Sequence, residues 1–524
     1  MSDPLLPYRT QNWILSKPGA CGRRGVVVSQ VRDAAEAGVA ILDAGGNAVD
    51  AAVATALALT AVEPWNSGLG GIGFALVHRS GEASAQVVDF GPVAPHRLAG
   101  SMFKLTGRMK QDLFAWPEVE GDTNIHGPLS FAIPSATAGY AHMHDLWGKL
   151  PLAEIIAPAL ALAKRGLPQD WFTTLKIAFS AAVLRNYPES ARIYLPNGLP
   201  PVPPYQGSPG FFRLGALPHT LEQLGKAGLR DQYEGEIAAS IVSDVAAIGG
   251  ILSAEDLKRC QARILRPTLF PWRGHEIQMA GGLTAAPTMH RVLEQMISLP
   301  RRDSPDAEWF VALSQALKRA YAERLAGLGD VDLNAAETCT THLTVCDAEG
   351  TMVALTTTLL SSMGSRVVLP GTGILMNNGI MWFDPRPNQP NSLAGGKRPL
   401  TNMSPIIVND TNRPWFAAGA SGGRRILSSV VQLLAFVTDF GMDLETAAHY
   451  PRIDVSDPDT VSVDARMADD IVRALIAGGP TKVVEHGVMP INFACPNAIV
   501  RTQDELRFGI SDAASPWSAA IAQP

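Results

Sequence analysis

An abrupt change of pattern at Thr340 constrains the fold of this chain more than any other feature. The segment from Gly327 to Glu337 is polar and has no periodicity, whereas residues 341–347 alternate between apolar and polar side chains as a β-strand does. A hydroxyl residue at such a boundary can attack the peptide bond that precedes it. Thr340 would then become a new N-terminus, and its free amine could act as the base for its own hydroxyl.

The residues after Thr340 predict a hairpin that brings threonines together. Residues 347–350, Asp-Ala-Glu-Gly, are typical of a turn between strands at 341–347 and 352–358. If the loop has two or three residues, the residue numbers of two paired positions add up to 697 or 698. Thr340 then faces Thr357 or Thr358. Facing Cβ atoms lie about 4.5–5.5 Å apart, within reach of a hydroxyl contact. From spacing alone, the pattern favours the interpretation that Thr340 is an ordinary β-branched residue that starts a strand.

The composition is that of a globular protein without charged or apolar extremes. Of 524 residues, 46% are hydrophobic and 18% charged, with a net charge of −6, and no basic run indicates a nucleic-acid or membrane partner. The longest apolar runs are too short to span a bilayer. The first 24 residues lack the order of a secretory signal, and five scattered cysteines indicate reduced thiols. We therefore expect a cytoplasmic protein.

The order of expected elements predicts an α+β fold. Helices are expected at 33–43, 49–62, 142–150, 152–164, 221–225, 235–248, 254–259, 307–326 and 424–440. Strands are expected at 68–77, 85–90, 267–279, 341–347, 352–358, 374–377, 405–409 and 415–418. Helices, then strands, then more strands and helices suit a four-layer αββα sandwich, with two mainly antiparallel sheets stacked face to face between helical layers. The Pro- and Gly-rich residues 194–210 are interpreted as an exposed excursion.

Two glycine-rich segments differ in what they predict. Residues 68–73 match G-x-G-x-x-G but follow a helix and enter a strand, the reverse of a dinucleotide site. In residues 419–423, Gly-Ala-Ser-Gly-Gly, consecutive glycines before a helix could form an oxyanion hole. The same letters match the G-x-S-x-G nucleophile elbow of α/β-hydrolases, with Ser421 as nucleophile and His449 or His486 downstream. Hairpin-linked strands before Ser421 argue against that alternative, and a plain tight turn also remains.

Several short motifs, taken in order, resemble the γ-glutamyltransferase family. They are Leu42–Ala52, Glu63-Pro64, Gly68–Gly71, Thr340-Thr341-His342, Asn377-Asn378, Lys397–Leu400, Met403–Pro405 and Ser421–Gly423. The resemblance covers nearly the whole chain and is specific in combination. It implies an N-terminal nucleophile hydrolase fold that cleaves itself between Cys339 and Thr340. A large fragment, 1–339, and a small one, 340–524, would together form one αββα unit, which could pair further into a homodimer.

The resemblance also implies residue roles. By position in the motifs, Thr340 matches the nucleophile and Thr358 the assisting threonine, while Gly422 and Gly423 match the donors to the oxyanion. The resemblance implies no metal and no cofactor.

The substrate pocket departs from the family pattern. Gly91 and Trp382 stand where the family has a carboxylate-binding arginine and an amine-binding acid, and Gly379 and Leu360 replace two further polar residues. Thr401 and Asn402 replace a serine pair and keep its hydrogen-bonding capacity, whereas the short segment 383–397 leaves no room for the usual lid. Because a buried charge that loses its ionic partner is destabilised by several kcal/mol, we expect a smaller or less polar acyl group than glutamyl.

The remaining candidates for substrate binding follow from the same motifs. Asn378, Trp382, Thr401 and Asn402 are the predicted substrate-binding residues, with Asn402, Arg366 and Arg424 as candidate carboxylate anchors. Residues 377–385 resemble the branch that contains oxamate amidohydrolase, which implies conversion of oxamate to oxalate and ammonia in purine catabolism. Alternatives are a γ-glutamyl (glutathione) hydrolase or transferase, a cephalosporin-acylase-like amidase, and an unprocessed, non-catalytic relative.

Overall fold

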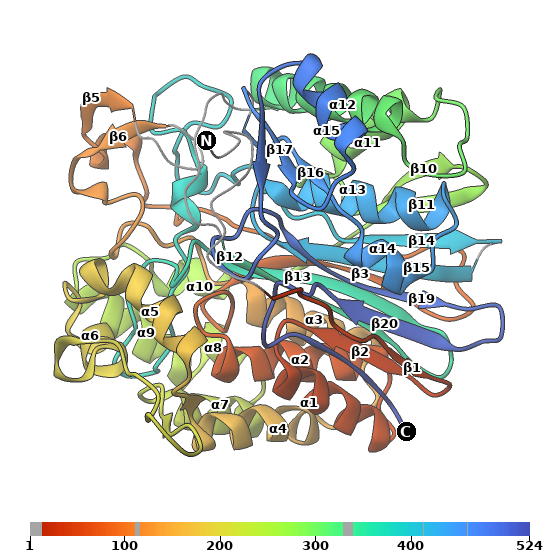
Figure 1. The fold of residues 1–524 in the computed structure, drawn as a ribbon. Coiled ribbons are helices and arrows are strands. Elements are labelled where there is room, and N and C mark those ends of the chain that lie inside the picture. The colour runs from red at the N-terminus through yellow and green to blue at the C-terminus, as the bar shows by residue number, and fades with distance from the viewer. Residues whose placement is uncertain (1–12, 110–115, 329–338, 412, 458) are drawn as a thin grey trace.

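Two seven-stranded antiparallel sheets stack face to face at the centre of the molecule (Figure 1). The computed structural model describes residues 13–109, 116–328, 339–411, 413–457 and 459–524, without the side chains of 325–328 and 339. The first sheet runs β1 (Ala20–Gly22), β20 (Arg507–Ser511), β19 (Cys495–Arg501), β15 (Arg413–Ser421), β14 (Ile406–Asp410), β11 (His275–Met279), β10 (Thr268–Trp272). The second runs β21 (Ala519–Ala522), β2 (Val26–Ser29), β12 (Cys339–Cys346), β13 (Met352–Leu360), β3 (Ile72–His78), β4 (Gln86–Phe90), β9 (Arg263–Leu265).

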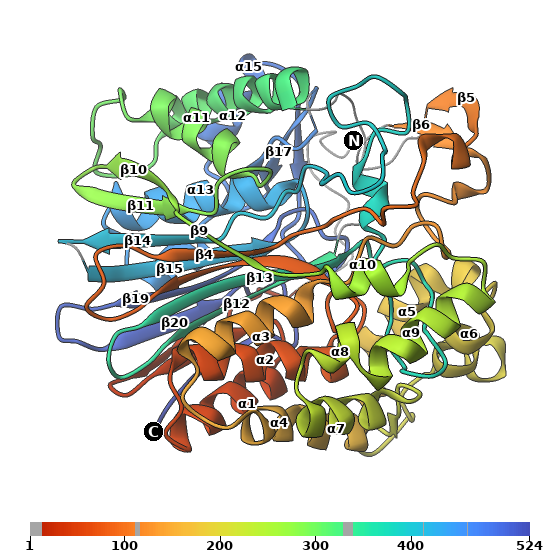
Figure 2. The same cartoon turned by 180° about the vertical axis from the view of Figure 1, so that it is seen from behind.

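Helices cover the outer face of each sheet (Figures 1 and 2). On the side of the second sheet lie α1 (Arg32–Asp43), α2 (Ala48–Val62), α3 (Ala136–Trp147), α4 (Leu152–Arg165), α5 (Trp171–Leu184), α6 (Pro188–Tyr194), α7 (Leu217–Ala227), α8 (Asp231–Glu234), α9 (Glu236–Ala247) and α10 (Ala254–Lys258). Against the first sheet lie α11 (Ala286–Met296), α12 (Ala307–Leu328), α13 (Arg425–Thr438), α14 (Leu444–His449) and α15 (Asp469–Ala477). The predicted αββα sandwich is therefore confirmed.

Both faces of the second sheet are buried. Val26 and Val28 point into the core between the sheets, while Val27 packs with the helices on the other face. Helix α2 is the centre of the helical layer, and all of its residues are buried. Its alanines allow close packing, and Asn47 caps its N-terminus in a capping box with Asp50. The sheet that carries Thr340 is thus held rigidly on both sides.

Three predictions of helices and strands need correction. The local sequence pattern shows neither how strands pair nor exactly where a helix begins. The expected strand at 267–279 is the hairpin β10–β11, which turns at Arg273 and Gly274 with φ of +53° and +97°. Residues 374–377 form no strand, only a single bridge from Leu375 to Val368. Helix α3 begins at Ala136, earlier than the expected 142. Helices α5 and α11 were not predicted at all.

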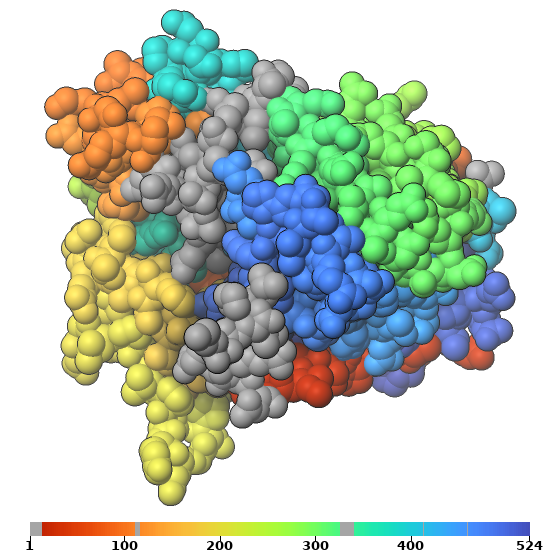
Figure 3. All heavy atoms as spheres, turned by 45° about the horizontal axis from the view of Figure 1, so that its top comes forward, coloured from red at the N-terminus to blue at the C-terminus, as the bar shows by residue number. Residues whose placement is uncertain are grey.

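Short strands outside the two central sheets form three smaller sheets. They are β5 (Leu105–Met109) with β6 (Pro117–Val119), β7 (Leu167–Pro168) with β8 (Phe211–Phe212), and β16 (Ile453–Asp454), β17 (Val461–Asp464) and β18 (Thr481–Val484). The predicted excursion at 194–210 projects from the surface (Figure 3, yellow), with Tyr205 fully exposed. No helix within the described ranges is long and apolar enough to cross a membrane.

The glycines of residues 68–73 serve backbone packing where the chain enters β3. A Cβ on Gly70 would lie 2.1 Å from the carbonyl oxygen of Leu375, and one on Gly73 would lie 2.3 Å from that of Thr356. Neither backbone atom can swing away as a side chain could. The glycine pattern is therefore explained by close approach of neighbouring chains.

Replacing Gly70 by alanine should destabilise the protein by roughly 1–3 kcal/mol, because the added methyl overpacks against the Leu375 carbonyl. Denaturant unfolding of Gly70→Ala and wild type measures the difference. Gly100→Ala is the matched control, since its Cβ would meet only the Leu393 carbonyl oxygen at 3.5 Å. Equal losses in both variants would contradict this explanation.

Candidate active site

Thr340 lies at an irregularity in the pairing of β12 with β13. Thr341 pairs with Thr357, a sum of 698 and one of the two predicted registers, and Cys339 pairs with Leu360. One residue of β12, Thr340, therefore opposes two residues of β13, Thr358 and Leu359. Such a bulge re-aims the side chain at its centre and is common next to active sites. Most of the polar segment before it, 329–338, lies outside the described residues.

Thr340 opens into a small pocket of about 50 Å³. The pocket is lined by Gln30, Glu63, Asn66, Phe172, Lys176, Thr340, Ser421, Gly422, Val488, Ile491, Cys495, Ala514, Ser515 and Pro516. Apart from Thr340, these residues come from the turn after β2, from the ends of α2 and β15, from α5, and from the C-terminal part of the chain. The fold thus gathers five segments around one threonine.

The glycine-rich turn after β15 provides one wall of this pocket. Gly422 and Gly423 have φ of +136° and +60°, and a Cβ on Gly422 would lie 2.7 Å from Cα of Ala494. Among the described residues, neither of their N–H groups donates a hydrogen bond. Both stand just before α13, whose dipole adds positive potential. The turn can therefore hold an anionic oxygen near Thr340.

Ser421 is not a nucleophile elbow of the α/β-hydrolase type. It ends β15, which pairs antiparallel with β14 and β19, whereas that elbow follows a strand in a parallel sheet. The alternative built on Ser421 is therefore wrong. Ser421 lines the same pocket as Thr340 and belongs to its wall.

Glu63, which sequence analysis passed over as a catalytic candidate, is buried and lines the same pocket as Thr340. Thr341 Oγ1 donates a hydrogen bond to its Oε2, and Asn66 Nδ2 donates to its Oε1 at 2.7 Å. Burial raises the pKa of Glu63 to about 7, although those two hydrogen bonds and the charge of Lys176 act in the opposite direction. The signal in the sequence was an acid directly after a helix, α2, that is mostly alanine, leucine and valine.

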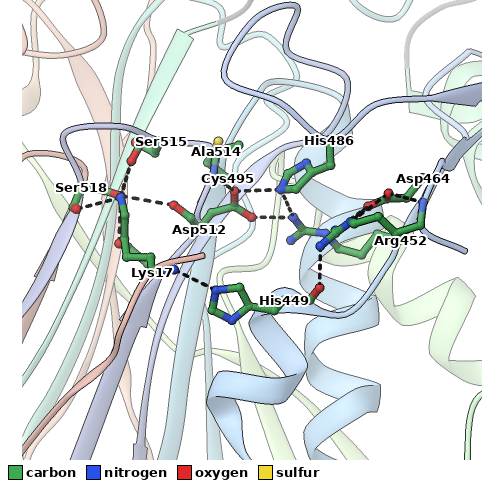
Figure 4. Close-up of polar contacts among 12 residues, drawn as sticks. Lys17, His449, Arg452, Asp464, His486, Cys495, Asp512, Ala514, Ser515 and Ser518 are labelled. Carbon is green, nitrogen blue, oxygen red and sulfur yellow. Dashed lines mark hydrogen bonds and ion pairs between the residues drawn. The ribbon is translucent and has the colours of Figure 1, made fainter. Parts of the chain in front are cut away.

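A buried ionic network braces the C-terminal wall of the pocket (Figure 4). Asp512 accepts a hydrogen bond from Arg452 Nη2 at 2.5 Å and lies 3.1 Å from His486 Nε2. Lys17 Nζ donates to Ser518 Oγ at 2.7 Å and to the carbonyl of Ser515, which lines the pocket. The charges of His486 and Arg452 hold the pKa of Asp512 below its usual range despite its burial. This network fixes the loop that closes the pocket.

The four predicted substrate-binding residues lie outside the lining of this pocket. Asn378 uses its amide to bond the Ile125 carbonyl and the Ser361 hydroxyl, both at 2.7 Å. The hydroxyl of Thr401 donates to the Leu283 carbonyl at 3.1 Å, and Asn402 beside it is half-buried. Trp382 packs in the core between the sheets, with Leu360 and Met403. Their part in substrate binding remains a prediction.

Neither candidate arginine reaches the pocket. Arg366 donates to the Ser361 hydroxyl at 2.8 Å and to the Gly364 carbonyl at 2.5 Å, and Arg424 lies with its Cζ 5.6 Å from the centre of the Tyr321 ring. The cation that does line the pocket is Lys176 of α5. It was missed because α5 itself was not predicted.

Two stacked antiparallel sheets between helices, with a strand-initial threonine in a pocket at their end, define the N-terminal nucleophile hydrolase fold. The cephalosporin acylase structure from Bacillus halodurans shares this fold, with a TM-score of 0.83 at 24% identity over 100% of this chain and 99% of that one. The γ-glutamyltranspeptidase family model matches residues 34–339 and 334–522. The chain belongs to the γ-glutamyltranspeptidase family, as its motifs predicted.

Curated relatives match along most of their length. An Acylase ACY 1 proenzyme of Pseudomonas sp. (strain V22) is 29% identical, over 91% of both chains. A glutathione hydrolase proenzyme of Escherichia coli (strain K12) is also 29% identical, over 87% of this chain and 85% of its own.

Glu63→Gln should change how stability depends on pH. The folded pKa of about 7 exceeds the ordinary 4.5, so the folded state binds more protons than the unfolded state between these values. The stabilisation from protonated Glu63 is therefore complete below pH 4.5 and lost as pH rises through 7. Glutamine mimics the protonated form. We expect Glu63→Gln to gain up to about 3 kcal/mol relative to wild type between pH 5 and 8.

Unfolding free energies at several pH values measure this difference. Glu154→Gln, at an exposed position on α4, is the matched control and should show no such trend. A difference that is independent of pH would contradict a raised pKa at Glu63.

Proposed function

We propose that this protein is a self-processing amidohydrolase whose nucleophile is Thr340. The observation that carries the proposal is that Thr340 and Gly422 line one small pocket, and that the Gly422 N–H donates no hydrogen bond within the described part of the chain. Cleavage between Cys339 and Thr340 would leave fragments 1–339 and 340–524. The division of the family match near residue 339, and the relatives named proenzymes, support this cleavage.

The chemistry of turnover needs only groups of the chain and water. The amine of Thr340 takes the proton of its own hydroxyl, and Oγ1 attacks the amide carbonyl to form a C–O bond. The N–H groups of Gly422 and Gly423 hold the oxyanion, a contribution worth about 2.7–4 kcal/mol for one such donor in another enzyme. The C–N bond then breaks, the amine leaves with the proton, and water hydrolyses the ester. Thr358, next to the bulge, assists by hydrogen bonding to the nucleophile.

The size of the pocket favours a compact acyl group. Its 50 Å³ is far below the roughly 150 Å³ of a cavity that admits benzene. The positions that hold a glutamyl headgroup in the family are taken here by Gly91, Leu360 and Trp382. Oxamate, which yields oxalate and ammonia, is the substrate we propose.

A second candidate is an acylase or glutathione hydrolase that takes longer acyl groups. The names of the curated relatives favour it, since they include both activities. The leaving part of such a substrate would extend from the pocket mouth.

Thr340→Ala should abolish both cleavage and amide hydrolysis, because it removes the attacking oxygen. The variant is expected as one 55.7 kDa chain, where wild type gives two fragments that end at residue 339 and begin at residue 340. Thr340→Ser should still cleave, more slowly. Intact mass spectrometry reads both, with Thr481→Ala on β18 as a control that cleaves normally. A wild-type chain that hydrolyses amides while uncut would refute the proposal.

A substrate panel separates the two candidates. We expect kcat/KM for ammonia release from oxamate to exceed that for γ-glutamyl-p-nitroanilide by at least about tenfold, since the pocket excludes the longer headgroup. Thr340→Ala serves as the blank for both assays. The reverse order would transfer the assignment to the second candidate.

A further inference from the structure

Lys176 lies on the buried face of α5. Only 7% of the residue is exposed, and its neighbours on the same face, Thr173, Ile177 and Ser180, are at most 3% exposed. Lysine is almost never buried to this degree unless it is paired. Its ammonium lies 5.2 Å from the centre of the Phe172 ring, which offers only a weak cation–π contact.

The charge of Lys176 has no direct partner in the described part of the chain. It forms no ion pair and donates no hydrogen bond to any described residue. Its field nevertheless reaches two groups of the pocket, since it opposes the raised pKa of both Glu63 and the Cys495 thiol. Neither of these groups neutralises it by contact. The ammonium is thus a buried donor that lines a cavity and has no hydrogen-bond acceptor among the described residues.

That cavity is the pocket of the nucleophile. Lys176, Thr340 and Gly422 line the same 50 Å³ space, so a molecule whose carbonyl is presented to Thr340 and Gly422 has its other end confined near the remaining walls. Apart from Lys176, the only other charged residue of the lining is Glu63, whose charge has the opposite sign. A carboxylate directly attached to the scissile carbonyl, or one carbon beyond it, would satisfy the ammonium.

We propose that Lys176 is the specificity-determining residue that binds a substrate carboxylate, and that the substrates are monoamides of short dicarboxylic acids. The inference rests on the proposed function and deepens it, because it names the residue that binds the carboxylate of oxamate and extends the substrate class to the short homologues of oxamate. It replaces Arg366, Arg424 and Asn402 as the anchor. The competing explanation is that Lys176 serves only as a distant counter-charge for Glu63, in which case substrate charge would not matter.

Oxalate and oxamide test the proposal, because they share one two-carbon skeleton and differ only in that oxalate carries carboxylates where oxamide carries neutral amides. In titration calorimetry on the processed protein, we expect oxalate to bind and oxamide to bind roughly tenfold or more weakly. Lys176→Met should lose oxalate affinity by roughly tenfold or more, and Lys176→Arg should retain most of it. Lys164→Met, an exposed lysine of α4, should behave as wild type.

Kinetics give an independent reading. With oxamate, Lys176→Met should raise KM by at least about tenfold with a smaller effect on kcat, since the contact is made in the ground state as well. The proposal would be overturned if a folded Lys176→Met bound oxalate with an affinity within twofold of wild type. It would also be overturned if the wild-type protein showed no preference for oxalate over oxamide. If Lys176→Met does not fold, the wild-type preference and Lys176→Arg still decide.

The two proposals fail separately. Absence of cleavage and turnover would remove Thr340 as nucleophile, while calorimetry of oxalate with the uncleaved chain would still report on Lys176. Conversely, a cleaved enzyme that hydrolyses neutral amides as well as anionic ones would keep the nucleophile and remove the anchor.

Discussion

The position of Thr340 depends on one side chain, that of His342, which packs between the two sheets. His342 of β12 hydrogen-bonds with Thr356 at 2.9 Å and Thr344 at 3.0 Å, and its carbonyl accepts from Asn497 Nδ2 of β19 at 2.7 Å. A Cβ on Gly419 of β15 would lie 2.3 Å from the ring. Burial lowers the pKa of His342 to about 3, so the ring stays neutral. Because His342 is close in sequence to Thr340, and Gly419 to Gly422, this contact fixes the position of Thr340 relative to the glycine-rich turn after β15.

The pocket concentrates buried polar groups that a stable core would avoid. Removing one partner of a buried ion pair such as Arg452 with Asp512 costs about 3–5 kcal/mol, yet apolar replacements are often neutral or better. The network therefore contributes little net stability. Its value lies in geometry, since Asp512 also accepts from the Ala514 N–H at 2.8 Å and so fixes a pocket wall. The role of these buried polar groups in holding the pocket wall explains their presence better than a contribution to stability does.

Pairing within the hairpin could be predicted from the sequence, whereas the walls of the pocket could not. A shift of β12 by one residue would move its side chains to the opposite face of the sheet. The alternation of apolar and polar residues and the length of the turn therefore left only two ways of pairing β12 with β13. Glu63 meets Thr341 across 278 residues, a contact that no local pattern encodes. Lys176 was missed because α5 is apolar on nearly every side and shows little helical periodicity. The αββα layers were predictable because the order of helices and strands along the chain restricts how these elements can stack.

The departures from the family pattern and the position of Lys176 have one physical explanation. Leu360, Met381, Trp382 and Met403 form part of the apolar core between the sheets. The pocket that Thr340 lines is bounded instead by α5 and by residues between 488 and 516. That pocket offers a buried cation in place of the missing arginine. On the proposed assignment, Lys176 binds a carboxylate within the same small pocket as the scissile carbonyl, which links a short acyl chain to a lysine anchor.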